Sequence, residues 1–144
     1  MKLLDANILL YAYDSSSAHH AACRSWLEAA LNEGEPVGLP WQTSLAFIRI
    51  STNPRAVRTP LGVEDACAIV DTILGRPTAH IVEPGDQFWS IFRELVHSAK
   101  VSGPLVTDAV LAALALEQGA TLCSTDRDFR RFANLKLVDP TDEG

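Results

Sequence analysis

The sequence predicts an α/β fold in which a mainly parallel sheet of four to five strands carries helices on both faces. Two observations support this prediction. Short apolar runs alternate along the 144 residues with longer segments whose apolar residues recur at helical spacing. Glycine and proline separate these segments, as in residues 34–36 and 75–77. No repeat or linker divides the chain, so we expect one domain over residues 1–144.

The short apolar runs are the predicted strands, and they lie at residues 2–4, 37–39, 80–82, 121–123 and 136–138. The predicted helices between them cover residues 7–13, 19–31, 41–50, 63–74, 87–98, 108–118 and 127–132. Pro54 ends the third helix, because a residue before proline avoids the helical conformation. Gly119 is placed to cap the helix of residues 108–118. Trp26, Trp41 and Trp89 are predicted to anchor the core.

Composition narrows the class of protein. The chain is 47% hydrophobic and 21% charged, as in an ordinary globular protein, and its net charge is −6. That charge argues against nucleic-acid binding by bulk attraction, but it allows a local basic face. Two groups of basic residues could each form such a face, or could simply be solvated surface. The first group is Arg49, Arg55 and Arg58, and the second is Arg127, Arg130, Arg131 and Lys136.

Cysteine usage and the N-terminal segment predict a cytoplasmic protein. Cys23, Cys67 and Cys123 are scattered, with no C-x-x-C pair, which favours reduced, buried thiols over disulfides or zinc ligands. The chain passes from Met1 directly into strand-like sequence without a signal peptide. No apolar run approaches membrane-spanning length, so we expect no membrane association.

Three aspartates occupy equivalent places in this pattern. Asp5 ends the first strand, Asp126 follows the fourth strand by two residues, and Asp108 opens the helix that leads into the fourth strand. Such a helix runs antiparallel to the strand it feeds, so its N-terminus lies at the carboxyl edge of the sheet. If the first and fourth strands are neighbours, all three carboxylates meet there. Carboxylates gathered at that edge are typical ligands of Mg²⁺ or Mn²⁺, which predicts a metal-dependent phosphodiesterase.

Each aspartate also has a structural explanation. Asp5 or Asn7 could be the N-cap of the first helix. Thr107 could cap the helix of residues 108–118, with Asp108 a first-turn acid that favours the helix dipole. Thr125 could cap a surface turn. The alanine-rich sequence behind Asp108 favours the functional interpretation, since small residues let that helix approach the sheet closely.

Taken together, residues 4–11, 106–115 and 124–129 resemble the PIN-domain family, and more narrowly the VapC toxins of bacterial type II toxin–antitoxin pairs. Residues 39–55 resemble one VapC branch. The resemblance spans the chain and implies a three-layer α/β/α domain with sheet order 3-2-1-4-5. It also implies an endoribonuclease that depends on Mg²⁺, which Mn²⁺ could replace. The resemblance further implies that the protein forms a homodimer and is silenced by a VapB-like antitoxin.

The metal-binding and catalytic acids of the family fall on Asp5, Asp108 and Asp126. We expect four further side chains to orient these ligands or water, namely Asn7, Thr107, Thr125 and Asp128. Contacts with the RNA substrate are expected from Arg49, Arg55, Arg58 and Arg127.

The family's remaining acid, a glutamate on the helix after the second strand, would fall at Ala46. The sequence departs from the family there, although Gln42 and Thr43 lie one turn earlier on the same helix. This departure leaves open a catalytically weakened PIN-like module that only binds RNA or an antitoxin. A phospho-acceptor signalling domain fits less well, because the first strand offers one acid and the third ends in Glu83.

Overall fold

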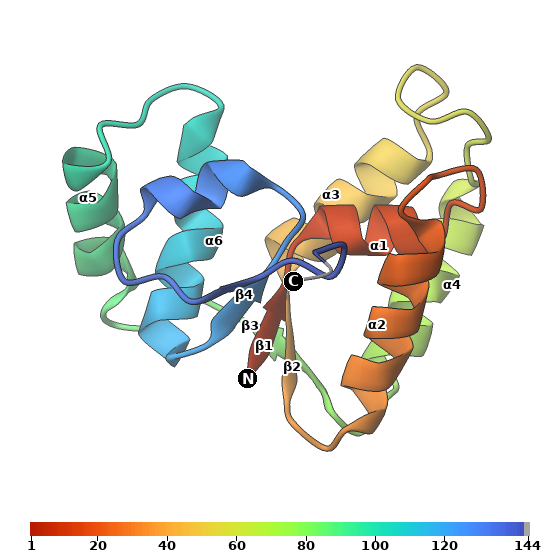
Figure 1. Ribbon diagram of the computed structural model, residues 1–144, viewed down its shortest axis with the longest axis horizontal. Coiled ribbons are helices and arrows are strands. Elements are labelled where there is room, and N and C mark those ends of the chain that lie inside the picture. Colours follow the sequence, from red (N-terminus) through yellow and green to blue (C-terminus); the bar gives the residue numbers. More distant parts are fainter. Residues whose placement is uncertain (143–144) are drawn as a thin grey trace.

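A five-stranded sheet forms the centre of the computed structural model, which describes residues 1–142 (Figure 1). Its strands are β1 (Lys2–Leu4), β2 (Val37–Pro40), β3 (Ala79–Val82), β4 (Thr121–Cys123) and β5 (Leu137–Val138). They are ordered β3-β2-β1-β4-β5, and every neighbouring pair is parallel. The predicted sheet order is therefore confirmed, and with it the neighbour relation between β1 and β4.

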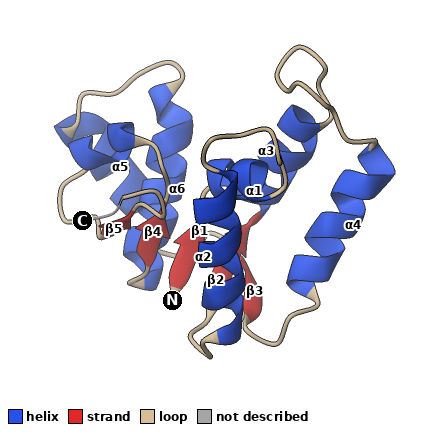
Figure 2. Cartoon of the chain, turned by 45° about the vertical axis from the view of Figure 1, so that its right-hand side comes forward, coloured by secondary structure: helices blue, strands red, loops and turns tan. Residues whose placement is uncertain are grey.

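The helices are α1 (Ala6–Ala12), α2 (His20–Asn32), α3 (Trp41–Ser51), α4 (Val63–Leu74), α5 (Phe88–Ser98) and α6 (Leu105–Gln118). A 3₁₀ helix, η1 (Arg127–Arg131), stands where a short helix was predicted. Figure 2 shows the strands between two groups of helices, with α5 and α6 on one side and α1 to α4 on the other. Within residues 1–142, no helix has the length and apolarity needed to cross a membrane.

The two faces of the sheet are covered by two separate cores, as the three-layer prediction requires. Leu4 and Cys123 face the core formed with α1, α2, α3 and α4. Their neighbours Leu3 and Leu122 face the core formed with α5, α6 and η1. All four side chains are 0% exposed. Successive side chains of a strand point to opposite faces of the sheet. A strand that is covered on both faces therefore needs apolar residues at consecutive positions.

Helix α6 begins earlier than its sequence predicts. It starts at Leu105, so Asp108 lies in its first turn and does not open the helix. The N-cap is Pro104, and Thr107 does not serve as the cap. Proline suits this position, because its fixed φ matches the helix and its missing N–H is not needed there. The predicted C-terminal cap is confirmed, since Gly119 adopts the left-handed conformation with φ 63°.

The prediction that three tryptophans anchor the core is wrong for two of them. Trp89 is 64% exposed and Trp41 is 43% exposed, whereas Trp26 is partly buried beneath the ammonium group of Lys2. The inward stripe of α5 passes through Phe92 and Leu95. Trp89 follows Phe88 by one residue, which rotates its side chain about 100° away from that stripe.

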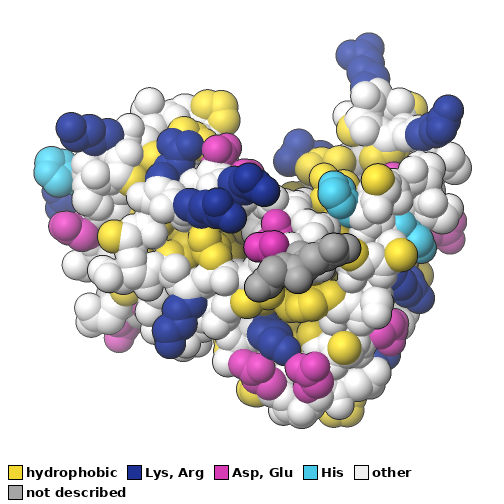
Figure 3. All heavy atoms as spheres, viewed as in Figure 1, with side chains coloured by type: hydrophobic (Ala, Val, Ile, Leu, Met, Phe, Trp, Pro, Cys, Tyr) yellow, Lys and Arg dark blue, Asp and Glu magenta, His cyan; other side chains and the backbone are white. Residues whose placement is uncertain are grey.

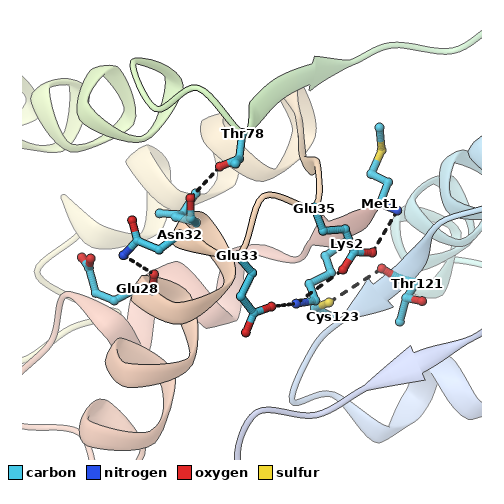
Figure 4. A network of polar contacts seen from close by, with 10 residues as sticks. Met1, Lys2, Glu28, Asn32, Glu33, Glu35, Thr78, Thr121 and Cys123 are labelled. Carbon is cyan, nitrogen blue, oxygen red and sulfur yellow. Dashed lines mark hydrogen bonds and ion pairs between the residues drawn. The ribbon is translucent and has the colours of Figure 1, made fainter.

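The amino edge of the sheet carries acids that are paired with cations. Lys2 Nζ lies 2.6 Å from Glu33 Oε2 and 3.6 Å from Glu35 Oε2 (Figure 4). The hydrogen bond to Glu33 raises the pKa of Lys2 above its ordinary value. Thr78 Oγ1 donates to the carbonyl of Leu31 at 2.8 Å in the same region. The carboxyl edge of the sheet differs, because several acidic side chains lie close together there with few basic side chains to pair with them.

Candidate metal-binding active site

Asp5 is both a helix cap and a member of the site. Its backbone N–H donates to the carbonyl of Cys123 at 3.0 Å, which continues the β1–β4 pairing by one residue. Its Oδ1 accepts from the backbone N–H of Ala6 at 2.7 Å, so Asp5 is the N-cap of α1. The capping interpretation is therefore correct, and it holds the carboxylate at the carboxyl edge of the sheet.

Ser124 joins the two strand ends. Its Oγ donates to Asp5 Oδ2 at 2.7 Å and accepts from the backbone N–H of Asp126 at 3.0 Å. The amide of Asn7 donates to the same Oγ at 3.2 Å, and Asn7 Oδ1 accepts from the backbone N–H of Thr125 at 3.4 Å. One buried hydroxyl thus fixes the relative positions of the segments that carry Asp5 and Asp126.

Ser124 was not among the predicted site residues. The signal is the β1–β4 register, in which Leu4 pairs with Cys123 and the following residues, Asp5 and Ser124, come side by side. That register cannot be read from either strand alone.

A second group of acids lies beside this hydroxyl. Asp108, Asp126 and Asp128 each place a carboxylate oxygen within 4.8 Å of the others. Asp126 Oδ1 accepts from the backbone N–H of Asp128 at 2.8 Å and so caps η1. Arg131 Nη2 lies 3.3 Å from Asp128 Oδ1. Asp128 was predicted to support the ligands from outside, but its carboxylate reaches the cluster itself.

The electrostatics of this cluster favour a cation. Burial, together with the charges of Asp126, Asp5 and Asp128, raises the pKa of Asp108 to about 6, whereas the charge of Arg131 opposes the shift. Burial also raises the pKa of Asp5, against the hydrogen bonds from Ser124 and Ala6. Carboxylates that repel one another are stabilised in the ionised form by a nearby positive charge.

The donor chemistry fits a hard divalent cation. The group offers carboxylate oxygens from the end of β1, the first turn of α6 and the start of η1. Oxygen donors of this kind suit Mg²⁺ and Mn²⁺. The three acids whose oxygens lie close to one another are Asp108, Asp126 and Asp128. Asp5 is near enough for its charge to raise the pKa of Asp108.

Two of the predicted orienting residues are threonines, Thr107 and Thr125. Thr107 is exposed in the first turn of α6. Within residues 1–142, the hydroxyls of Thr107 and Thr125 make no hydrogen bond to the carboxylates of Asp5, Asp108 or Asp126. Their predicted roles as orienting residues stay predictions.

Helix α3 contributes to the site through Thr43. Its Oγ1 donates to the carbonyl of Leu4 at 2.6 Å, directly before Asp5, and its side chain is buried. Ala46 is partly buried one turn later. Of the arginines predicted to contact RNA, Arg127 directly follows Asp126, whereas Arg49 lies at the end of α3. Arg55 and Arg58 follow in the segment of residues 52–62; all four are exposed.

Comparisons with known proteins confirm the predicted family. The family model described as PIN domain matches residues 2–135. Ribonuclease VapC43 of Mycobacterium tuberculosis is 40% identical over 142 residues, covering 99% of this chain and 97% of its own. Ribonuclease VapC37 of the same species is 38% identical over 140 residues, covering 97% of both.

Solved structures share the fold. VapBC2 from Rickettsia felis, in complex with a promoter DNA fragment, matches with a TM-score of 0.72 at 20% identity, over 96% of this chain and 97% of that one. VapC20 of M. tuberculosis, described as a sarcin–ricin loop cleaving toxin, matches with a TM-score of 0.62 at 14% identity, over 94% and 99%. With a full-length family match and relatives at 40% identity, the chain belongs to the PIN domain family and, within it, to the VapC ribonucleases of toxin–antitoxin systems.

Proposed function

We propose that the protein is a metal-dependent endoribonuclease that acts as a toxin by hydrolysing RNA phosphodiester bonds with Mg²⁺, or Mn²⁺, held by Asp5, Asp108 and Asp126. The observation that carries the proposal is the convergence of Asp108, Asp126 and Asp128, whose carboxylate oxygens lie within 4.8 Å of one another. The raised pKa of Asp108 agrees with this crowding. Such repulsion destabilises the folded protein when no cation is present, whereas a bound cation offsets it.

When bound, the cation supplies Lewis-acid polarisation of the scissile phosphate and activation of the attacking water. The chain's own residues hold the geometry. Asp5 is immobilised by hydrogen bonds to both of its oxygens, from Ala6 and Ser124. Asp128 is held beside the cluster by Arg131. Asn7, Thr107 and Thr125 orient ligands or water, and no covalent intermediate forms on the protein.

RNA is the proposed substrate. The relatives are named ribonucleases, and VapC20 is described as a sarcin–ricin loop cleaving toxin. The exposed guanidinium groups proposed to contact RNA phosphates are those of Arg49, Arg55, Arg58 and Arg127. Local contacts of this kind are needed because the net charge of −6 repels RNA as a whole.

A VapB-like antitoxin is the proposed partner, since the structural relatives include VapBC complexes. An arginine from the antitoxin would pair with the carboxylates that otherwise hold the metal, and so block the site. We further propose a homodimer that acts in the cytoplasm. Light scattering that finds a monomer at micromolar concentration would count against the dimer, and a complex that still cleaves RNA would count against this form of silencing.

Cleavage of RNA by the purified chain tests the proposal. We expect hydrolysis that stops in EDTA, returns with Mg²⁺ or Mn²⁺, and is absent from the Asp108→Asn protein. Binding of RNA without cleavage at any metal concentration would instead support a catalytically weakened module, which the alanine at position 46 favours.

A further inference from the structure

Helix η1 has three faces, because a 3₁₀ helix repeats every three residues. One face carries Phe129, which packs against Phe132 in the core beside α6. The second face carries Asp128 and Arg131, which pair with each other beside the acidic cluster. The helix is therefore anchored by one face and contributes to the candidate metal site with another.

The third face of η1 carries Arg127 and Arg130, three residues apart and both exposed. These two side chains line a pocket of about 170 Å³ that also includes Ser124 and Asp126. Figure 3 shows basic and acidic side chains next to one another near the centre of this view. Since Asp126 belongs to both the acidic cluster and the pocket, a group bound in the pocket lies directly beside the candidate metal site.

The rest of the pocket comes from β5 and the segment after it. Leu137 and Val138 provide an apolar wall, and Val138 is 37% exposed. Asp139 and Asp142 provide carboxylates. Guanidinium groups bind phosphate and stack on the faces of nucleobases, while apolar side chains pack against the rings. A nucleotide combines the features that this lining recognises.

We propose that this pocket binds the nucleotide next to the scissile phosphate, and that Asp139 selects a base with an amino group on its edge. The choice of RNA as ligand rests on the proposed ribonuclease function. Arg127 and Arg130 hold the nucleotide through its phosphate and base face, and the end of β5 supports the ring. The pocket thereby contributes to where the RNA is cut.

The hydrogen bonds of Asp139 carry the base preference. Its Oδ1 accepts from the backbone N–H of Thr141 at 2.8 Å and from Thr141 Oγ1 at 2.7 Å. Within the described part of the chain, these bonds leave Oδ2 to accept from a further donor. Cytosine offers its N4 amino group to such an acceptor, whereas uracil carries a carbonyl oxygen at the same place, which a carboxylate repels.

Binding of cytidine and uridine 5′-monophosphates to the metal-free protein tests the pocket without any need for catalysis. The two probes differ in the group that Asp139 is proposed to read. We expect cytidine monophosphate to bind about tenfold more tightly, as one base-reading hydrogen bond implies. Amide shifts in NMR spectra should centre on residues 124–130 and 137–139. Arg130→Ala should abolish binding, whereas Arg93→Ala, which changes an exposed arginine on α5, should not affect it.

Asp139→Asn tests the preference itself. The asparagine keeps Oδ1 for Thr141 and replaces Oδ2 with an amide donor, so the preference should reverse toward uridine monophosphate. In RNA cleavage, the same variant should change which sites are cut. Equal binding of both nucleotides, or binding unaffected by Arg130→Ala, overturns the pocket even if the protein cleaves RNA. Selective nucleotide binding by a protein that never cleaves RNA overturns the ribonuclease proposal and leaves the pocket standing.

Discussion

Ser124 Oγ donates a 2.7 Å hydrogen bond to Asp5 Oδ2 across 119 residues of sequence. The two residues come together because each directly follows one of a pair of adjacent parallel strands. The bond favours the ionised carboxylate and so lowers the pKa of Asp5, against the burial that raises it. The same oxygen accepts from the backbone of Asp126, so one side chain positions two proposed ligands.

Ser124→Ala should therefore weaken metal binding roughly 10- to 100-fold, the usual effect of removing a group that orients a ligand. Without this donor the pKa of Asp5 rises further, so binding should also require a higher pH than in the parent protein. Calorimetric titration with Mn²⁺ at pH 6 and pH 8 measures both effects. Ser102→Ala, at an exposed position, is the control. Equal affinities for both variants would show that Ser124 has no positioning role.

Asp108→Asn should abolish cleavage and make the metal-free protein more stable at neutral pH. The pKa of Asp108 is raised from 3.8 to about 6, so the folded state binds its proton more tightly than the unfolded state does. The resulting penalty on folding is absent below pH 3.8, grows as the pH rises toward 6, and is complete above it. Asparagine removes this penalty while it keeps the shape of the side chain.

Urea unfolding in EDTA at pH 3.5 and pH 7.5 measures this effect, with the exposed Asp71→Asn on α4 as the control. The gain in stability should be present only at pH 7.5. A variant of unchanged structure that cleaves RNA at the parent rate would remove Asp108 from the proposed ligands.

Ala46→Glu should strengthen metal binding. The family resemblance predicts an acid at the position of Ala46. A site without that carboxylate should need millimolar-range Mg²⁺ or prefer Mn²⁺. A glutamate that points into the cluster adds a ligand, but it also adds repulsion when no metal is present. We expect tighter metal binding, faster cleavage at low Mg²⁺ and a less stable metal-free protein. Unchanged affinity in calorimetry would mean that position 46 does not face the site.

Gly38→Ala should destabilise the sheet. A Cβ at Gly38 would lie 2.7 Å from Val82 Cγ2 and 2.9 Å from Leu3 Cδ1, inside the core. The neighbours must move to accommodate it, and overpacking of this kind costs about 1–3 kcal/mol. Urea denaturation measures the loss. Gly62→Ala is the matched control, because the nearest atom to its added Cβ is Asp65 Oδ2 at 3.8 Å. A Gly38→Ala protein as stable as this control would refute the close packing.

Much of the framework could be predicted from the sequence because its signals are local. Apolar runs and helical periodicity located the strands and helices to within a few residues. Gly119 marked a helix end because the left-handed conformation suits glycine. The placement of three aspartates at one sheet edge followed from the direction in which helices return to parallel strands. The order of the strands came from the family resemblance.

Other features depend on which elements meet, and only the tertiary structure decides them. The register of β1 against β4 brings Ser124 to Asp5, and neither strand encodes that pairing by itself. The rotation of α5 leaves Trp89 exposed, although its sequence suggests a core anchor. The periodicity of a short segment also does not distinguish a 3₁₀ turn from an α-helical turn. In the structure, the three-residue repeat of η1 directs Asp128 to the acidic cluster and Arg130 to the neighbouring pocket. Sequence by itself determined which residues are proposed to carry the chemistry, because residue type and spacing are local properties. Their neighbours were decided by packing, because contacts between distant segments depend on the whole fold.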